Sequence, residues 1–503
     1  MKILTTAQIR QADQYTIENE PIASIDLMER AAKAFYDAIK QRLRKQDVIK
    51  VFCGMGNNGG DGLAVSRMLV LSGYNVQTYK IVHSEKASPD FAENEKRLLK
   101  LKRANYSEIH SKDDLPPLSE TDIVIDALFG SGLSRPIEGF PAKVVKHINA
   151  SVAKVIAVDL PSGLFAEDNT GNTEETIIKA NYTYTFQLPK LAFLFPDNAE
   201  FIGIWQVLDI GLSSEFISRQ ETPWHFLTGA ELKPHFRPRS KFAHKGNFGH
   251  GLLIAGSQGK SGAAVLAAKA ALAMGPGLIT THVPRCNYAI QQGSLPEGMV
   301  SLDEDEHYFS GIPNAGSWSA IAAGPGLGKE KQTTQALKLV IQNTAKPLIF
   351  DADALNILAE NPTWLSFLPP GTILTPHVGE FERLAGKSNN GWERLEKARE
   401  MAFRFKCYIV LKGAHTAIVA PDKQVIFNST GNPGMAKGGS GDVLTGVILG
   451  LLTQGYSSLF SAMTGVYLHG LAADLAVKKI PLESLMAGDI IRLLPQALRK
   501  TFY

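Results

Sequence analysis

The chain has 503 residues, of which 44% are hydrophobic and 20% charged, and its formal net charge is +3. This length allows two or three domains with complete cores, and the composition is that of an ordinary globular protein. The small net charge gives no indication of nucleic-acid binding, and no run of 18 apolar residues predicts a membrane span. Because the N-terminus lacks the apolar core of a signal peptide, we expect a cytoplasmic protein. Its three cysteines lie far apart without metal-ligand spacing and fit small core residues.

The first part of the chain predicts two helices, a buried strand and a glycine-rich loop. Apolar residues recur at helical spacing up to Leu43, and the second helix opens near Ser24. The strand Val48–Cys53 runs into the loop Gly54–Gly62, and a helix follows from Leu63. A strand, a glycine loop and a helix in this order suit a phosphate group or a dinucleotide. The alternative is a tight turn in which Asn and Gly serve only the backbone conformation.

Strands and helices then alternate as far as residue 208. Strands are predicted at Asn75–Val82, Asp122–Phe129, Lys154–Asp159, Tyr182–Gln187 and Ile204–Leu208. Helices are predicted at Ser88–Arg103 and near Ala142–Asn149. This alternation indicates an α/β domain with a mostly parallel sheet.

Three strand ends in this half carry polar side chains: Asn57, Asn58 and Asp61, then Asp126, then Asp159 with Ser162. Ligands of open α/β sheets bind at the carboxyl ends of strands, so we expect these groups to converge. Asn58, Asp126 and Ser162 offer hard oxygen atoms that suit an alkali or alkaline-earth cation. Taken singly, each Asp is also explained as a turn former or a helix cap.

A polar segment separates the two halves. Between Ser213 and Lys245 the alternation gives way to residues rich in Pro, Arg and Lys, and we place a domain boundary near residue 220. Its basic residues fit either a phosphate-binding patch or a solvated connector. Beyond it, short apolar segments again stop at polar or glycine-bearing turns: Gly249–Gly256, Leu278–Val283, Ser319–Gly328, Pro347–Asn356, Thr372–Glu380 and Tyr408–Thr416. This pattern indicates a second α/β domain.

The stretch Gly431–Gly446 is the main candidate for an anion site in the second half. A glycine-rich loop precedes an apolar helix from Val443 to Leu452, and the free amides at a helix start bind anions. Asp442 stands at this start, where its charge would repel a phosphate group. It fits a base that acts on a hydroxyl group, and the alternative is an ordinary acidic residue of a first helical turn.

Other residues of the second half allow both a functional and a structural interpretation. Lys412 and Thr416 fit contacts to a nucleotide, although Lys412 at a strand end is equally explained as a surface cation. His377 fits a donor to a substrate or a structural histidine, and Asp353 with Asn356 fits a helix cap. The absence of a Walker or GxSxG motif near these residues disfavours P-loop and α/β-hydrolase chemistry.

The motifs occur as a set. The first half carries Gly-Met-Gly-Asn-Asn-Gly-Gly-Asp-Gly, Asp-Ala-Leu-Phe-Gly-Ser-Gly-Leu and Ala-Val-Asp-Leu-Pro-Ser-Gly. The second half carries Ala-Gly-Pro-Gly-Leu-Gly, Asp-Ala-Asp-Ala-Leu-Asn, Leu-Thr-Pro-His-Val-Gly-Glu, Leu-Lys-Gly-Ala-His-Thr and Gly-Gly-Ser-Gly-Asp-Val-Leu-Thr-Gly. In this order they resemble the bifunctional NAD(P)H-hydrate repair enzymes, over nearly the whole chain. The resemblance implies two doubly wound α/β domains: a Rossmann-like three-layer epimerase in residues 1–220 and a ribokinase-like dehydratase in residues 221–503.

For the first domain the resemblance implies a site for the hydrated nicotinamide dinucleotide. Its binding positions are Asn57, Asn58, Gly59, Gly60, Asp61, Gly130, Ser131, Gly132, Leu133, Ser134, Arg135, Pro136 and Asp159. Asn58, Asp126 and Ser162 match the family's potassium ligands. Asp159 is the candidate acid/base for interconverting the R and S hydrates, which differ at the carbinol carbon of the reduced ring.

For the second domain the resemblance implies an S-hydrate site beside a nucleotide site. Ala263, Gly326, His377 and Asp442 match the substrate positions, and the nucleotide positions are Lys412, Gly413, Ala414, His415, Thr416, Gly438, Gly439, Ser440 and Gly441. Asp442 would deprotonate the ring hydroxyl as it receives a phosphoryl group, while loop amides stabilise the phosphoryl charge. Phosphate then leaves, and NADH or NADPH is regenerated. ADP is the expected donor, giving AMP and phosphate, with Mg2+ at the site.

An ATP-dependent small-molecule kinase is the main alternative, because a ribokinase-like site with Asp442 would also phosphorylate a hydroxymethyl group. This alternative gives the Asn57–Asp61 motif no role. A binding or scaffold protein would not need Asp126, Asp159 and Asp442, which are all present. The resemblance further implies a homo-oligomer with small-molecule substrates and without a nucleic-acid or membrane partner.

Overall fold

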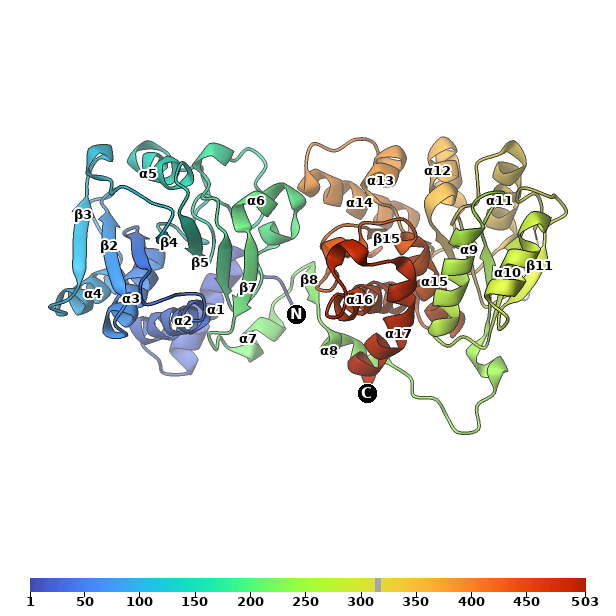
Figure 1. Ribbon diagram of the computed structural model, residues 1–503, viewed down its shortest axis with the longest axis horizontal. Coiled ribbons are helices and arrows are strands. Elements are labelled where there is room, and N and C mark those ends of the chain that lie inside the picture. The colour runs from blue at the N-terminus through green and yellow to red at the C-terminus, as the bar shows by residue number, and fades with distance from the viewer. Residues whose placement is uncertain (313–317) are drawn as a thin grey trace. The chain divides into compact units, whose positions relative to one another are not determined.

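The computed structural model describes residues 1–312 and 318–503, which divide between two compact units (Figure 1). The first unit spans Lys2–Thr222, and the second spans Pro223–Tyr503 together with Met1. Each unit has its own sheet and its own hydrophobic core. No helix in the described ranges is long and apolar enough to cross a membrane.

The first sheet has seven parallel strands in the order β3-β2-β1-β4-β5-β6-β7. Their bounds are Val48–Cys53 (β1), Asn75–Ile81 (β2), Asn105–Ile109 (β3), Asp122–Ala127 (β4), Lys154–Val158 (β5), Tyr182–Phe186 (β6) and Ile204–Leu208 (β7). The strand order reverses between β1 and β4, which pair in the middle of the sheet. In doubly wound sheets the carboxyl ends of the strands at such a switch point form the ligand crevice.

Helices cover both faces of this sheet, so the predicted three-layer α/β domain is confirmed (Figure 1). They are α1 (Thr6–Asn19), α2 (Ser24–Ile39), α3 (Asn57–Leu71), α4 (Pro89–Leu99), α5 (Gly139–Asn149), α6 (Ala199–Ile202) and α7 (Ser214–Arg219). One core cluster packs Phe35 of α2 and Leu63 of α3 against the sheet. A second cluster contains Val144 and Ile148 of α5.

Helix α3 begins at Asn57, well before the predicted start, so Gly59 and Gly62 belong to the helix rather than to a loop. A Cβ atom at Gly62 would lie 2.6 Å from the Cβ of Ala127, and one at Gly59 would lie 1.8 Å from the Gly54 oxygen. These glycines therefore let the first turns of α3 lie directly against the ends of β1 and β4.

The second sheet has ten strands in the order β11-β10-β9-β12-β13-β14-β15-β16-β17-β8. Their bounds are Trp224–Leu227 (β8), His250–Ile254 (β9), Leu278–Val283 (β10), Met299–Leu302 (β11), Ala320–Ala323 (β12), Leu348–Phe350 (β13), Ile373–Leu374 (β14), Tyr408–Leu411 (β15), Ala417–Val419 (β16) and Val425–Asn428 (β17). Among these described strands, β16 runs antiparallel to both neighbours, and the other pairs are parallel. The order reverses between β9 and β12, which creates a second switch point.

The helices of this unit are α8 (Gly229–Leu232), α9 (Ser261–Ala273), α10 (Tyr288–Ser294), α11 (Lys331–Asn343), α12 (Ala352–Glu360), α13 (Val378–Ala385), α14 (Gly391–Phe405), α15 (Ser440–Thr453), α16 (Ser458–Ala476) and α17 (Ala487–Phe502). Helix α15 packs closely on α9, because a Cβ at Gly446 would lie 2.0 Å from the Ala267 oxygen. It begins at Ser440 rather than Val443, so Asp442 belongs to its first turn.

The segment interpreted as a connector contributes a strand to the second sheet. Trp224–Leu227 (β8) pairs in parallel with β17, and Trp224 lies opposite Val425. The second unit therefore starts before Gly249–Gly256, the first strand predicted for it. Four residues are too few to show an apolar alternation, so the sequence pattern does not reveal this strand.

Candidate functional site

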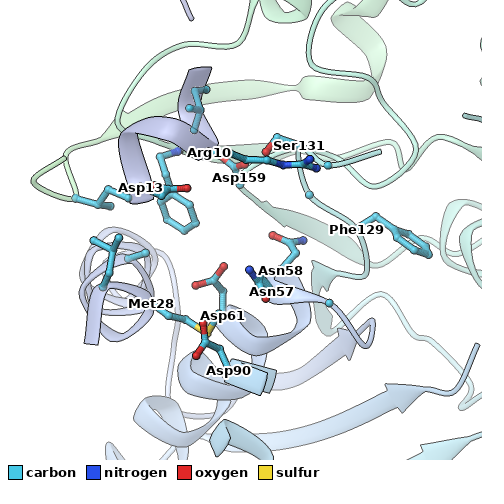
Figure 2. A pocket seen from close by; sticks show the side chains of 18 of the residues that line it. Arg10, Asp13, Met28, Asn57, Asn58, Asp61, Asp90, Phe129, Ser131 and Asp159 are labelled. Atoms are coloured by element: carbon cyan, nitrogen blue, oxygen red, sulfur yellow. Dashed lines mark hydrogen bonds between the residues drawn. The ribbon is translucent and has the colours of Figure 1, made fainter. Parts of the chain in front are cut away.

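A pocket of about 480 Å³ opens in the first unit, lined by the segments that follow β1 and β4 (Figure 2). Of the predicted binding residues, it brings together Asn57, Asn58, Asp61, Gly130, Ser131, Gly132, Leu133 and Asp159. Gly59 and Gly60 are buried elsewhere on α3, where a Cβ at Gly60 would lie 2.8 Å from Met28 Sδ. Ser134, Arg135 and Pro136 continue the second loop beyond the residues that line the pocket.

Asp159 follows β5 and is held in one orientation from several sides. Its φ of +63° is a conformation that residues with a side chain rarely adopt, and its N–H donates to the Tyr184 oxygen at 2.9 Å. Its Oδ1 accepts hydrogen bonds from the Thr185 hydroxyl and the Phe186 amide, both at 3.0 Å. The same oxygen lies 2.9 Å from Nζ of Lys190, which is 1% exposed. The pocket wall therefore carries a fixed, ion-paired carboxylate.

The predicted potassium ligands meet in part. Asp126 and Ser162 are fully buried, and the Ser162 hydroxyl donates to Asp126 Oδ1 at 2.6 Å. Burial raises the pKa of Asp126 to about 6, although hydrogen bonds from Ser162 and Leu128 oppose the shift. Asn58 Nδ2 is buried without a hydrogen-bond partner in the described residues, while its Oδ1 faces Gly130.

These atoms fit a monovalent cation. A cation beside Asp126 would stabilise a charge that burial disfavours, and the amide and hydroxyl oxygens of Asn58 and Ser162 are hard ligands. The described residues contain no group of three or more His, Cys, Asp or Glu that could hold a metal ion. The single charge of Asp126 among neutral oxygens suits K+ better than a divalent ion.

Two further carboxyl groups point into the same pocket, Asp13 from α1 and Asp61 from α3 (Figure 2). Burial raises the pKa of Asp13 to about 6, and the charge of Asp159 adds to this effect. Burial likewise raises the pKa of Asp61 well above its usual range, and the charges of Asp159 and Asp13 add to this increase. The pocket thus combines an ion-paired carboxylate with carboxyl groups that retain protons closer to neutral pH. Proton transfer between a base and an acid requires this combination.

The sequence prediction omits Arg10, Asp13 and Lys190, although all three line the pocket. Arg10 reaches the loop after β4, where a Cβ at Gly132 would lie 2.7 Å from its Nη2. No glycine loop or strand end marks Arg10 and Asp13, and their one signal is their spacing, which places two charged residues on one face of a helix. Lys190 follows the predicted strand Tyr182–Gln187, but without a glycine-bearing turn.

Lys412 and Asp351 form the centre of the candidate site in the second unit. Lys412 Nζ lies 2.8 Å from Asp351 Oδ1 and 3.7 Å from Glu380 Oε2, and the Thr445 hydroxyl donates to Asp351 Oδ2 at 2.7 Å. Burial acts to lower the pKa of Lys412, but the two carboxylates raise it overall. The interpretation of Lys412 as a surface cation is therefore wrong.

Asp442 lies beside this ion pair, and its side chain has no hydrogen bond to another described residue. Burial raises its pKa to about 6, the charge of Asp351 adds to the shift, and Lys412 opposes it. A carboxyl group with this pKa can accept a proton near neutral pH. Asp351 also replaces Asp353 as the cap of α12, so the cap interpretation of Asp353 is wrong. Asp353 instead accepts the Gly328 N–H at 2.9 Å.

The glycine loop leaves open space before α15. Gly439 is the N-cap of the helix with φ +92°, and a Cβ at Gly438 would meet no atom within 4 Å. A Cβ at Gly441 would lie 3.5 Å from Lys412 Nζ, which places the loop beside the lysine. Ser440 Oγ lies 3.3 Å from Nε2 of His469, whose pKa burial lowers to about 4. Free helix amides and a nearby lysine are the features that suit an anion.

The other predicted residues of this half lie at neighbouring strand ends. Ala263 and Gly326 follow β9 and β12, and a Cβ at Gly326 would lie 3.1 Å from that of Ala263. His377 caps α13, because its Nδ1 accepts the Gly379 N–H at 3.0 Å, so its structural interpretation is confirmed. The remaining predicted nucleotide residues form the turn between β15 and β16: Gly413, Ala414, His415 and Thr416.

Comparisons with known proteins agree with this two-part organisation. Residues 251–496 match a family model described as NAD(P)H-hydrate dehydratase, and residues 24–192 match one described as YjeF-related protein N-terminus. A relative from Moorella thermoacetica, named a bifunctional NAD(P)H-hydrate repair enzyme, is 37% identical over 99% of this chain and 97% of its own length. A relative of the same name from Thermofilum pendens is 35% identical over 99% of this chain and 96% of its own length. Another from Escherichia coli is 34% identical over 96% of this chain and 91% of its own length.

Solved structures resemble the second unit. An ADP/ATP-dependent NAD(P)H-hydrate dehydratase from Bacillus subtilis, co-crystallised with ATP and Mg2+, has a TM-score of 0.50 and 32% identity, over 55% of this chain and 98% of its own. A ribokinase-like superfamily protein from Enterococcus faecalis has a TM-score of 0.50 and 27% identity, over 56% of this chain and 98% of its own. The predicted ribokinase-like fold is thereby confirmed.

Proposed function

Because the chain belongs to the family of bifunctional NAD(P)H-hydrate repair enzymes, we propose that it restores hydrated NADH and NADPH to the intact cofactors. Its first domain, residues 1–220, interconverts the R and S hydrates, and its second, residues 221–503, dehydrates the S form. The observation that carries this proposal is that each unit holds an aspartate beside a glycine-rich loop, Asp159 in the pocket of the first unit and Asp442 in the first turn of α15.

In the dehydratase, hydroxide is too poor a leaving group to depart unaided. Asp442 accepts the proton of the ring hydroxyl as that oxygen attacks the terminal phosphoryl group of the nucleotide. The amides of Gly438–Gly441 and the Lys412 ammonium stabilise the charge on the transferred group. Phosphate then leaves the ring carbon, the adjacent ring carbon gives up a proton to solvent, and the new carbon–carbon double bond restores the dihydropyridine ring. Ala263, Gly326 and His377 border the ring, and the turn Gly413–Thr416 contacts the nucleotide.

ADP is the proposed phosphoryl donor and gives AMP and phosphate. The described residues hold no protein cage for a divalent ion, so Mg2+ enters with the nucleotide phosphates. Asn58, Asp126 and Ser162 are the residues that would hold K+ in the first domain, where the ion would supply a positive charge beside the buried Asp126 carboxylate. The chain acts as a homo-oligomer, which size-exclusion chromatography with light scattering tests.

The test is a repair assay on separated R and S hydrates. With ADP, Mg2+ and K+, both hydrates should restore the absorbance of NADH, the R form only after epimerisation. Replacing K+ by Na+ at constant ionic strength should slow repair of the R form and leave that of the S form unchanged. If neither hydrate yields NADH with ADP or with ATP, the proposed function is wrong, and a small-molecule kinase becomes the better explanation.

The rate of dehydration should depend on the ionisation of Asp442. Its pKa of about 6 means that the carboxylate is the main form above pH 6 and the acid below it. Because the reaction needs the carboxylate, the rate should fall about ten-fold per pH unit below pH 6. Measuring kcat/KM for the S hydrate from pH 5 to pH 8 checks this. A rate that is constant across this range would contradict the role of Asp442 as base.

A further inference from the structure

The first unit contains a proton-transfer group that the proposed function does not use. Asp13 lies on α1, before residues 24–192, which are the part of this unit that matches the family model. It lines the same pocket as Asp159 and points into it (Figure 2). We propose that Asp13 is a second catalytic residue of the epimerase, which exchanges a proton with the ring nitrogen while Asp159 exchanges one with the hydroxyl group. This inference rests on the proposed function of the first domain.

The two carboxyl groups are held in contrasting ways. Asp159 is bonded to Lys190, Thr185 and the Phe186 amide, so its charge is compensated. The side chain of Asp13 has neither a hydrogen bond nor an ion pair with another residue of the described ranges. One aspartate is thus fixed as a base, and the other is free to hold a proton and present it to a ligand.

Other charged groups of the pocket act on Asp13. The negative charge of Asp159 raises its pKa, and the positive charge of Lys190 opposes this effect. Burial, with the charge of Asp159, raises the pKa of Asp13 to about 6, so this carboxyl group can lose and regain a proton near neutral pH. The remaining charged or titratable lining residues are Arg10, His83 and Asp90. Asp61 is 9% exposed, and burial raises its pKa well above its usual range.

The chemistry of the hydrate calls for two such groups, because its carbinol carbon bears both a hydroxyl group and the ring nitrogen. The Asp159 carboxylate takes the hydroxyl proton, the oxygen electrons form a carbonyl group, and the carbon–nitrogen bond breaks. Its electron pair goes to the nitrogen, which receives the proton of Asp13. Rotation about the adjacent carbon–carbon bond presents the other face of the aldehyde. Ring closure then returns one proton to Asp13 and one to the new hydroxyl, so both residues recover their original state.

The experiment measures epimerisation alone, because leaving out ADP prevents dehydration. Purified R hydrate is incubated with the full chain, and the S form is quantified by chromatography after subtraction of the spontaneous reaction. Asp13→Asn should lower kcat about 100-fold with little change in KM, because one proton-transfer group is lost. Glu18→Gln is the control, because it makes the same change of charge at an exposed position of the same helix. It should have the activity of the unaltered chain.

The pH profile separates this role from a structural one. Because Asp13 must be protonated to act, the wild-type rate should fall as pH rises above the pKa of Asp13 in the complex. This alkaline decline should disappear in Asp13→Asn and remain in Asp13→Glu and Asp61→Asn. If Asp13→Asn unfolds the first unit, the Asp13→Glu and Asp61→Asn profiles still decide the question.

Three results would overturn the inference. The first is an unchanged kcat in a folded Asp13→Asn chain. The second is an alkaline decline of the rate that persists in that variant. The third is an alkaline decline that disappears in Asp61→Asn but not in Asp13→Asn. Each of these leaves the proposed function intact, provided that the wild-type chain interconverts the hydrates. A wild-type chain without epimerase activity would instead disprove the proposed function itself.

Discussion

The dehydratase activity of the Asp442→Asn chain should be about 10²–10⁴-fold lower than that of the wild-type chain, and its epimerase activity should be unchanged. Asparagine has nearly the same shape as aspartate but cannot accept the hydroxyl proton. It also removes a charge that burial disfavours, so the fold should not be weakened. Dehydration is measured as NADH recovered from the S hydrate with ADP, and epimerisation as formation of the S hydrate from the R hydrate without ADP.

Asp422→Asn is the matched control, because Asp422 is an exposed aspartate of the same unit and follows β16. It should leave both activities unchanged. Nucleotide affinity, measured by calorimetry in the Asp442→Asn chain, should stay the same or rise, since a negative charge beside the phosphate site is removed. Equal loss of both activities in Asp442→Asn would contradict two independent sites.

The Lys190→Met chain should lose about 3–5 kcal/mol in the free energy of unfolding of its first unit. Lys190 is 1% exposed, and its removal leaves the Asp159 carboxylate buried without a cation, in a pocket that Asp13 and Asp61 share. Epimerase activity should fall together with the stability, because Asp159 loses the ion pair that fixes its carboxylate in the pocket wall. Hydrogen exchange of the amides of β5 and β6 reports unfolding of this unit alone.

Lys179→Met provides the comparison, because Lys179 is also ion-paired, 2.8 Å from Glu200, but on the surface. The same substitution at this surface position should lower the free energy of unfolding by less than about 1 kcal/mol. Adding Asp159→Asn to Lys190→Met should recover much of the lost stability, since the unpaired charge is then removed. No recovery in the double variant would mean that Lys190 stabilises the unit through packing and its backbone hydrogen bonds.

The sequence predicts well those parts of the fold that bury continuous apolar segments. Val48–Cys53 and Leu278–Val283 are buried almost throughout, and both are strands with the predicted bounds. Strand β3 (Asn105–Ile109) is not predicted, because it lies at a sheet edge and its residues are mostly exposed and polar. Edge strands lack the apolar pattern that marks central ones.

For the site, the sequence predicts residues that lie near glycine loops and strand ends. Asp159 and Asn58 belong to such motifs, and the structure places both at one pocket. Asp13 and Lys190 enter this pocket from a helix and a loop that carry no comparable motif, so only the fold brings them in. Lys412 could not be distinguished from a surface lysine, because its carboxylate partner Asp351 lies on another strand end.

The pairing of β8 with β17 also determines where this chain can be divided. A shortened chain that starts at residue 249 would keep every predicted strand of the second unit but lose Trp224–Leu227. The edge of β17, whose four residues are all buried, would then face solvent with free N–H and C=O groups. Exposed apolar edges of this kind recruit strands from other molecules. Insoluble material from such a fragment would therefore reflect a missing edge strand rather than an unstable dehydratase core.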